Sequence, residues 1–103
     1  MKEAEIRAIL GSNIKRFRLL NRLSQEELAE QVDISTTFLG SIESGKKWIS
    51  PHTLAKLSDA LRIKSYELFM PQTAASSEIQ RRTDEIFQTI KNSIDKIYFA
   101  YRE

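Results

Sequence analysis

The 103-residue sequence predicts an all-α fold. Apolar residues recur at helical spacing along most of the chain, and no stretch shows the alternation that is typical of a strand. The chain has 3 Gly and 2 Pro, few enough to favour long regular elements over many turns. Its length suits one domain with an appendage and is too small for two full domains.

The composition argues against several kinds of protein. Cysteine is absent, so the chain has neither disulfides nor thiolate metal ligands. No apolar run approaches the ~20 residues that cross a bilayer, and residues 1–10 contain acids and lack the apolar core of a signal peptide. We therefore expect a cytoplasmic protein with no membrane segment, no metal and no cofactor.

Two helices are predicted in the first third of the chain. Residues 3–20 carry apolar side chains at intervals of three and four: Ile6, Leu10, Ile14 and Phe17. The second helix begins after Ser24, because Glu27 stands three residues later and completes a capping box. Asp33 and Ile34 interrupt the pattern and end this short helix.

The third predicted helix runs from a cap at Ser35 to Gly45 and has an unusual outward face. Its apolar positions are Phe38, Leu39 and Ile42. The other positions are mostly small and uncharged: Thr36, Thr37, Gly40, Ser41 and Ser44. In a chain that is 29% charged, an exposed helix face ordinarily carries Lys and Glu. This face therefore suggests a fit against another surface.

The next two helices follow in quick succession. The Ser50–Pro51 pair provides a cap and a proline in the first turn, and this fourth helix continues to about Leu61. Residues 65–70 are predicted as a short fifth turn in which Tyr66 and Phe69 point inward.

Residues 71–77 are predicted to be a polar linker, and residues 78–103 a long amphipathic helix. Its main apolar stripe has steps of seven, four, seven and four residues: Ile79, Ile86, Ile90, Ile97 and Tyr101. Three more apolar side chains widen this face: Phe87, Ile94 and Tyr98. Such steps suit a seam between helices, and a lone helix is marginal in water. We expect this face to form a homodimer, with folding back onto the chain's own fifth helix as the alternative.

Two short helices joined by a turn of about three residues are typical of a helix-turn-helix. In that motif the second helix enters the DNA major groove, which is ~12 Å wide and suits slim, polar side chains without carboxylates. Between residues 11 and 23 the chain also carries basic residues and no acids: Lys15, Arg16, Arg18 and Arg22.

Five stretches carry a resemblance to a known family: "IKRFR", "LSQEELAEQVDIS", "FLGSIESGK", "SPHTLAKLSDALRI" and "YELF". Over residues 10–70 the chain resembles the Cro/phage-repressor helix-turn-helix family, also called the XRE family. The resemblance implies a lambda-repressor-like five-helix DNA-binding domain over residues 1–70. It also implies a transcriptional regulator, a repressor or controller-type protein, that binds a pseudo-palindromic operator in double-stranded DNA as a dimer.

The resemblance assigns roles to single residues. Gln25 matches a glutamine that bonds a phosphate and braces the recognition helix, and Arg18 and Glu43 match a pair that ties the first helix to the third. The whole set expected to contact DNA comprises Gln25, Ser35, Thr36, Thr37, Gly40, Ser41, Ser44, Lys46 and Lys47. Within it, Thr36, Thr37 and Ser41 match base-reading positions.

Some residues depart from the family pattern or allow a second interpretation. The family usually has Gly at the position of Asp33 and often has Gly at the position of Arg22. If these positions keep a positive φ, Asp tolerates it better than Arg, at a cost of about 1 kcal/mol. Thr36 and Thr37 also suit the first turn of any helix. Trp48 is expected to cover the fourth helix, with contact to the DNA backbone as the alternative.

A different function remains open beside DNA binding. The chain could be a protein-interaction module, such as an antitoxin whose C-terminal helix binds a partner protein. An enzyme is not expected, because His52 is the only histidine, no cysteine is present, and no set of acid, base and nucleophile can be assembled. The sequence also shows no separate domain for a small-molecule ligand.

Overall fold

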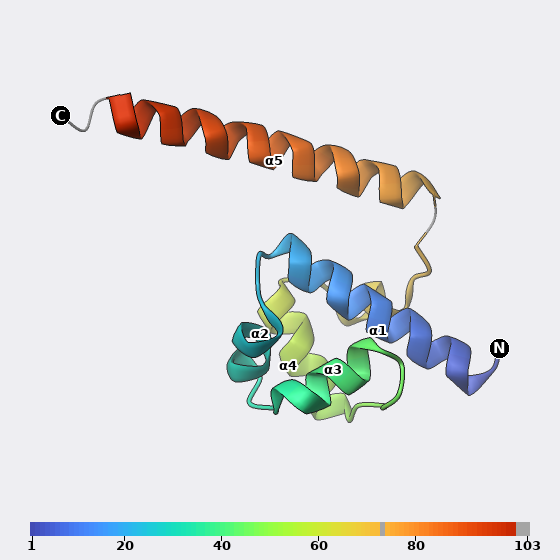
Figure 1. The fold of residues 1–103 in the computed structure, drawn as a ribbon. Helices are drawn as coiled ribbons and strands as arrows, with labels where there is room; N and C mark the ends of the chain where they lie inside the picture. Colours follow the sequence, from blue (N-terminus) through green and yellow to red (C-terminus); the bar gives the residue numbers. More distant parts are fainter. Residues whose placement is uncertain (73, 101–103) are drawn as a thin grey trace. The chain divides into compact units, whose positions relative to one another are not determined.

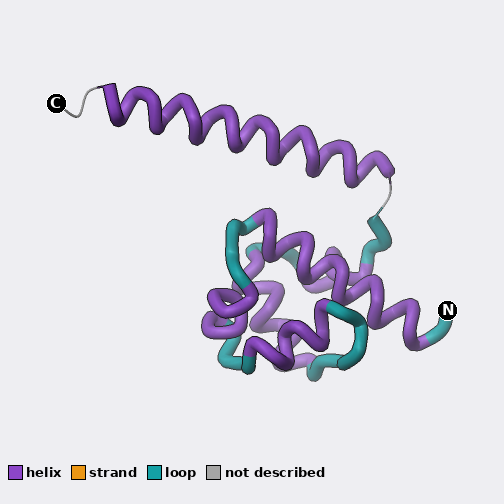
Figure 2. Tube along the Cα trace, viewed as in Figure 1, coloured by secondary structure: helices purple, strands orange, loops and turns teal. Residues whose placement is uncertain are grey.

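The computed structural model describes residues 1–72 and 74–100, except for the side chains of residues 74–76 and 80. Every regular element in these ranges is a helix (Figure 2). The predicted all-α class is therefore confirmed. The chain divides into two compact units, Met1–Pro71 and Gln72–Glu103.

The first unit contains four α-helices and one 3-10 helix (Figure 1). In chain order they are α1 (Glu3–Leu20), α2 (Gln25–Gln31), α3 (Thr36–Glu43), α4 (Pro51–Leu61) and η1 (Ser65–Phe69). Helix α1 lies along the group formed by α2, α3 and α4. The predicted boundaries of α1 and α4 agree with those observed.

Three of these helices begin at a serine that caps them: Ser24, Ser35 and Ser50. Each hydroxyl accepts a hydrogen bond from the backbone N–H three residues later. The Glu27 carboxylate in turn accepts the N–H of Ser24 at 3.0 Å, so the predicted capping box is present. A serine cap of this kind contributes about 1 kcal/mol.

All four α-helices of this unit end in the same way. The residue after the last turn has a positive φ: Arg22 (60°), Asp33 (57°), Gly45 (79°) and Arg62 (59°). The next N–H then returns to a carbonyl in the last turn, as in the 3.0 Å bond from Ile34 to Ala29. Glycine adopts this conformation without strain, whereas each of the other three residues costs about 1 kcal/mol.

The core of the first unit draws on every one of its helices. Its buried side chains are Leu10, Ile14, Leu28, Ala29, Val32, Leu39, Ile42, Ile49, Leu57, Leu61 and Leu68. A polar residue also lies within this interior, because Asn13 is buried and its amide donates to the carbonyls of Leu68 and Met70 at 2.9 and 2.8 Å. Asn13 thereby fastens η1 to α1.

The expectation for one aromatic residue was wrong, and that for another stays a prediction. Tyr66 does not point inward: it is 67% exposed, because Leu68 and Phe69 take the inward positions of η1. Trp48 is half exposed and contacts the ring of Phe69 in η1, with 6.1 Å between the ring centroids. Its expected packing on α4 stays a prediction.

The second unit contains α5 (Ala74–Ala100). It begins four residues before the predicted start at position 78. The alanines that follow residue 73 are strong helix formers. They were assigned to the linker because the residues around them are polar. Tyr101 lies outside the described residues. No helix in the described part of the chain is long and apolar enough to cross a membrane.

Candidate nucleic-acid interface

The turn between α2 and α3 sets the geometry of the candidate site. Asp33 reverses the chain at φ 57°, and Ile34 then packs against the core. Both helices bury one side, through Leu28 and Ala29 in α2 and Leu39 in α3. These contacts hold α3 as the second helix of a helix-turn-helix.

A buried ion pair joins α3 to α1. The Arg18 guanidinium donates to both carboxylate oxygens of Glu43, at 2.8 and 3.0 Å, and to the carbonyl of Leu23 at 2.9 Å. The amide of Gln25 donates to the same carboxylate at 3.1 Å. The two charged side chains are 8% and 5% exposed. The residues expected to brace α3 are thus in contact, and the one acidic side chain of α3 is turned inward and neutralised.

Gly11 allows the close approach of α1 and α3. A Cβ atom at this position would lie 2.3 Å from the carbonyl oxygen of Ile42 and 2.6 Å from that of Glu43. Gly11 was not among the residues predicted to matter, although a glycine inside a helical pattern is a sign of close packing.

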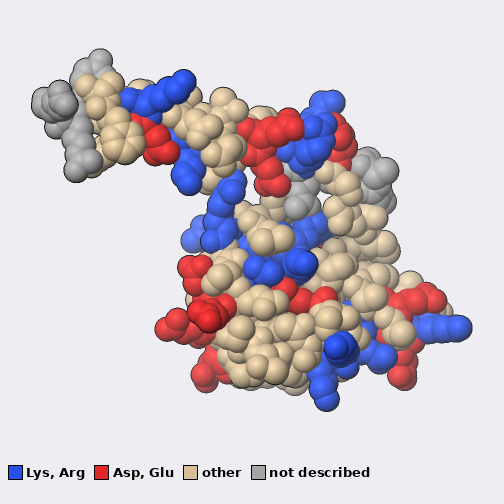
Figure 3. Space-filling view, in the orientation of Figure 1, with Lys and Arg blue, Asp and Glu red and all other residues tan. Residues whose placement is uncertain are grey.

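The exposed face of α3 is free of charge. Thr36, Thr37 and Ser44 are exposed, and Ser41 is partly exposed. Figure 3 shows few charged side chains over this helix, whereas acidic side chains gather over α2. The face therefore offers hydroxyl and methyl groups to whatever it meets.

The other two members of the expected set on this helix have structural contacts as well. The hydroxyl of Ser35 accepts the N–H of Phe38, so its oxygen already serves the cap. Gly40 leaves room for the side chain of Gln25, which lies 3.8 Å from the point where a Cβ would be.

Two lysines follow α3 directly. The backbone N–H groups of Lys46 and Lys47 both donate to the carbonyl of Ser41, at 2.9 and 3.2 Å, and their side chains are exposed. Arg7 supports the same loop by donating to the carbonyl of Gly45 at 3.2 Å. The loop thus holds two exposed cationic side chains next to an uncharged helix face.

The basic residues of α1 divide into two kinds. Lys15 is exposed, whereas Arg18 belongs to the buried pair. Arg16 lies 4.3 Å above the ring of Phe17 and donates to Asn13 at 3.2 Å. Burial lowers the pKa of the Arg16 guanidinium, and the charge of Glu67 opposes this shift. Much of the basic character of α1 therefore supports the fold.

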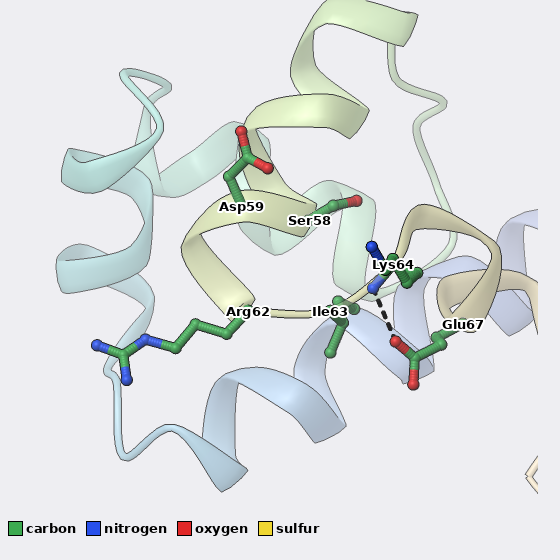
Figure 4. Close-up of a pocket in the computed structure, with 6 residues that line it drawn as sticks. All are labelled: Ser58, Asp59, Arg62, Ile63, Lys64 and Glu67. Carbon is green, nitrogen blue, oxygen red and sulfur yellow. Dashed lines mark hydrogen bonds between the residues drawn. The ribbon is translucent and has the colours of Figure 1, made fainter.

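A hollow at the end of α4 is separate from this face (Figure 4). It is lined by Ser58, Asp59, Arg62, Ile63, Lys64 and Glu67. Two of its polar groups already have internal partners, since Glu67 accepts the N–H of Lys64 at 2.7 Å and the Ser58 hydroxyl bonds within the protein. Among the described residues, no group of three or more His, Cys, Asp or Glu could hold a metal ion.

These features together define a helix-turn-helix domain with a braced and uncharged second helix. Residues 14–68, more than half of the chain, match the family model described as Helix-turn-helix, HTH_3. The chain therefore belongs to this helix-turn-helix family, the XRE type, as the resemblance predicted.

Known relatives agree with this assignment. The chain is 36% identical over 70 residues to the Neisseria hypothetical transcription factor from Neisseria meningitidis, a match that covers 67% of this chain and 65% of that protein, just under two thirds of its length. It is 35% identical over 68 residues to the control protein C.SmaI from Serratia marcescens, covering 66% of this chain and 81% of that protein.

A solved structure supports the fold. The restriction-modification controller protein C.AhdI from Aeromonas hydrophila superposes with a TM-score of 0.59 at 32% identity, covering 61% of this chain and 96% of that one. The names of these proteins are those of a transcription factor and of control proteins, which agrees with a DNA-binding regulator. Both the predicted fold class and the predicted class of protein are confirmed.

Proposed function

We propose that this chain is a sequence-specific transcriptional regulator, without catalytic activity, that acts as a homodimer on a pseudo-palindromic operator. The observation that carries this proposal is the state of α3. Its one carboxylate, on Glu43, is buried against Arg18, and its exposed face carries only small polar groups. A helix of this kind can enter a groove lined by phosphates without repulsion.

The side chains of α3 suit only modest base recognition. Thr36, Thr37 and Ser41 can each make a single hydrogen bond, and the threonine methyl groups can contact the methyl group of thymine. None of them makes the bidentate contact by which Arg recognises guanine. Sequence preference would therefore depend also on the shape of the DNA and on the spacing of two half-sites.

The charges next to α3 suit the DNA backbone. Lys46 and Lys47 lie in the loop that follows the helix and are exposed, so they can neutralise phosphates whatever the sequence. The amide of Gln25 stands at the start of α2 and beside Gly40, where it can bond a phosphate while it braces Glu43. The names of two relatives, a control protein and a controller protein, support a controller-type or repressor role.

Selection of bound sequences from a random pool of double-stranded DNA tests this function. We expect one motif with two half-sites about one helical turn apart, ~34–36 Å, and a steep fall of affinity with salt. A chain that enriches no sequence and does not bind random DNA at low salt would overturn the proposal. That result would favour the antitoxin-like alternative, in which α5 binds another protein.

A further inference from the structure

The loop that follows α3 lies against the first half of α1 (Figure 1). At Gly45 the chain has a φ of 79°, and a Cβ atom there would lie 3.4 Å from the Cα atom of Ala8. The exposed side chains of Lys46 and Lys47 follow directly after this contact. The position of both lysines therefore depends on how the chain at Gly45 is held on α1.

The peptide group between Gly45 and Lys46 is hydrogen-bonded at both ends. Its carbonyl oxygen accepts a bond from Nε of Arg7 at 3.2 Å, and its N–H donates to the carbonyl of Ser41 at 2.9 Å. A peptide group is planar and includes the Cα atom of the next residue. The two bonds therefore fix the rotation of this group and the point from which the Lys46 side chain leaves the backbone.

The two bonds attach the loop to different helices. The carbonyl of Ser41 also accepts the N–H of Lys47 at 3.2 Å and the hydroxyl of Ser44 at 3.1 Å, so it holds the loop to the end of α3. The bond from Arg7 joins the same segment to α1. The loop is thus held between two helices that the buried Arg18–Glu43 pair also connects.

A hollow lies beside the attachment to α1. It is lined by Glu3, Ile6, Arg7 and Trp48. An open hollow provides fewer dispersion contacts than close packing does. The hydrogen bond of Arg7 therefore accounts for a large part of the attachment of the loop to α1.

The guanidinium of Arg7 is already engaged within the protein. Its Nε bonds to the loop, and one of its terminal nitrogens lies 3.7 Å from the carboxylate of Glu3, one helical turn earlier. The Arg7 side chain is 32% exposed. This arrangement suits a residue that orients the loop better than one that grips a phosphate itself.

We propose that Arg7 is a positioning residue for the phosphate contacts of Lys46 and Lys47. The proposal rests on the DNA-binding function proposed above and adds to it a residue outside the matched positions 14–68. A loop that became ordered only on binding would lose conformational freedom at that moment. A loop that Arg7 holds in the free protein avoids this cost, so the two lysines bind phosphates more tightly.

Two substitutions in the full chain separate the hydrogen bond of Arg7 from its charge. The side-chain nitrogen of glutamine is as many bonds from Cα as Nε of arginine, so R7Q keeps a donor in place without the charge. R7K keeps the charge but carries its nitrogen one bond further away. In R7A both are lost.

The matched control for the lost charge is R82A in α5. Arg82 pairs with Glu78 four residues earlier, as Arg7 pairs with Glu3, so R82A removes the same charge and the same kind of pair. We expect R7Q to bind a random-sequence DNA duplex as tightly as R82A does. R7A should bind about fivefold more weakly than R82A, and R7K should bind more weakly than the natural chain.

A double-mutant cycle tests whether Arg7 acts through the two lysines. The salt slope of binding to the random duplex should fall by about one unit in R7A and by about two units in K46A/K47A. The triple variant R7A/K46A/K47A should have the slope of K46A/K47A, because Arg7 then has no lysine contact left to support. A further loss of about one unit in the triple variant would show that Arg7 itself neutralises a phosphate.

The outcomes separate this proposal from the function on which it rests. R7A that binds like R82A, or R7K that binds like the natural chain while R7Q binds like R7A, overturns the positioning role and leaves the regulator standing. A lower melting temperature of R7A with an unchanged salt slope also overturns it, because the effect would then be on stability alone. A natural chain that binds the random duplex but selects no sequence overturns the sequence-specific regulator and leaves the role of Arg7 intact.

Discussion

The two units of the chain differ in how far their apolar side chains are buried. In Met1–Pro71, the side chains of Leu10, Ile14 and Leu39 are completely buried within the unit. In α5, Ile86 and Ile90 are 62% and 54% exposed although their spacing is just as regular. Regular apolar spacing therefore predicts a helix in both units, but only the first unit supplies enough neighbouring helices to bury it.

The same contrast holds for their ion pairs. The Arg18–Glu43 pair is almost fully buried, with side chains 8% and 5% exposed, and links two helices. The pairs of Arg81 in α5 are about half exposed and lie within one helix. When one partner of a buried ion pair is removed, water cannot solvate the charge that remains. When one partner of an exposed pair is removed, water solvates the remaining charge.

Removal of α5 should have the largest effect and should separate the two units. A chain that ends at Thr73 is expected to stay folded, because its core is self-contained, and to sediment as a monomer. Loss of the linked second site should weaken operator binding by about 10²-fold or more. Sedimentation, thermal melting and DNA titration check this, and a fragment that is still dimeric would place the interface in the first unit.

Replacement of Arg18 tests the buried pair. In R18A the Glu43 carboxylate would be left buried without its cation, which should lower the free energy of unfolding by about 3–5 kcal/mol and weaken DNA binding. The matched control is R81A in α5, where the pairs are exposed to solvent and their loss should change stability little. Chemical denaturation measures both, and a similar small loss in the two variants would show that Glu43 is solvated.

The close approach of α1 and α3 can be tested with two glycines. In G11A the new Cβ would overlap the backbone of α3, and we expect a loss of about 3 kcal/mol in stability. In G40A the added methyl group meets only the Gln25 side chain at 3.8 Å, so stability should be unchanged or higher by up to about 1 kcal/mol. Equal melting temperatures of the two variants would contradict this account of Gly11.

Base reading is tested by removing hydroxyl groups from α3. The double variant T37A/S41A should lose about 1–3 kcal/mol of binding to the selected operator while binding to random DNA is nearly unchanged. K46A should weaken both DNAs alike and reduce the salt slope by about one unit. Equal losses of T37A/S41A on the two DNAs would show that these residues do not read bases.

The smallest effect is expected at the turn before α3. Asp33 has a φ of 57° and an exposed side chain, so D33G should stabilise the chain by about 0.5–1 kcal/mol through relief of backbone strain. DNA affinity should not change. A thermal melt checks the sign, and a destabilised variant would mean that the Asp33 side chain contributes more than its backbone conformation costs.

The local features of the fold could be predicted from the sequence alone. The capping box of Ser24 and Glu27 and the caps at Ser35 and Ser50 each involve residues three positions apart, so their partners are visible in the sequence. The helical period and the helix-turn-helix spacing are local for the same reason. The resemblance added what local patterns could not, which is that Arg18 and Glu43 belong together across 25 positions.

Only the tertiary structure decided the remaining features. Gly11 is required because two backbones meet there, and Asn13 is buried because the carbonyls of Leu68 and Met70 come within reach of its amide. Tyr66 lies outside because Leu68 and Phe69 fill the space beneath η1. Each outcome depends on which distant segments become neighbours, and that choice is made by packing of the whole core rather than by the spacing of residues along one helix.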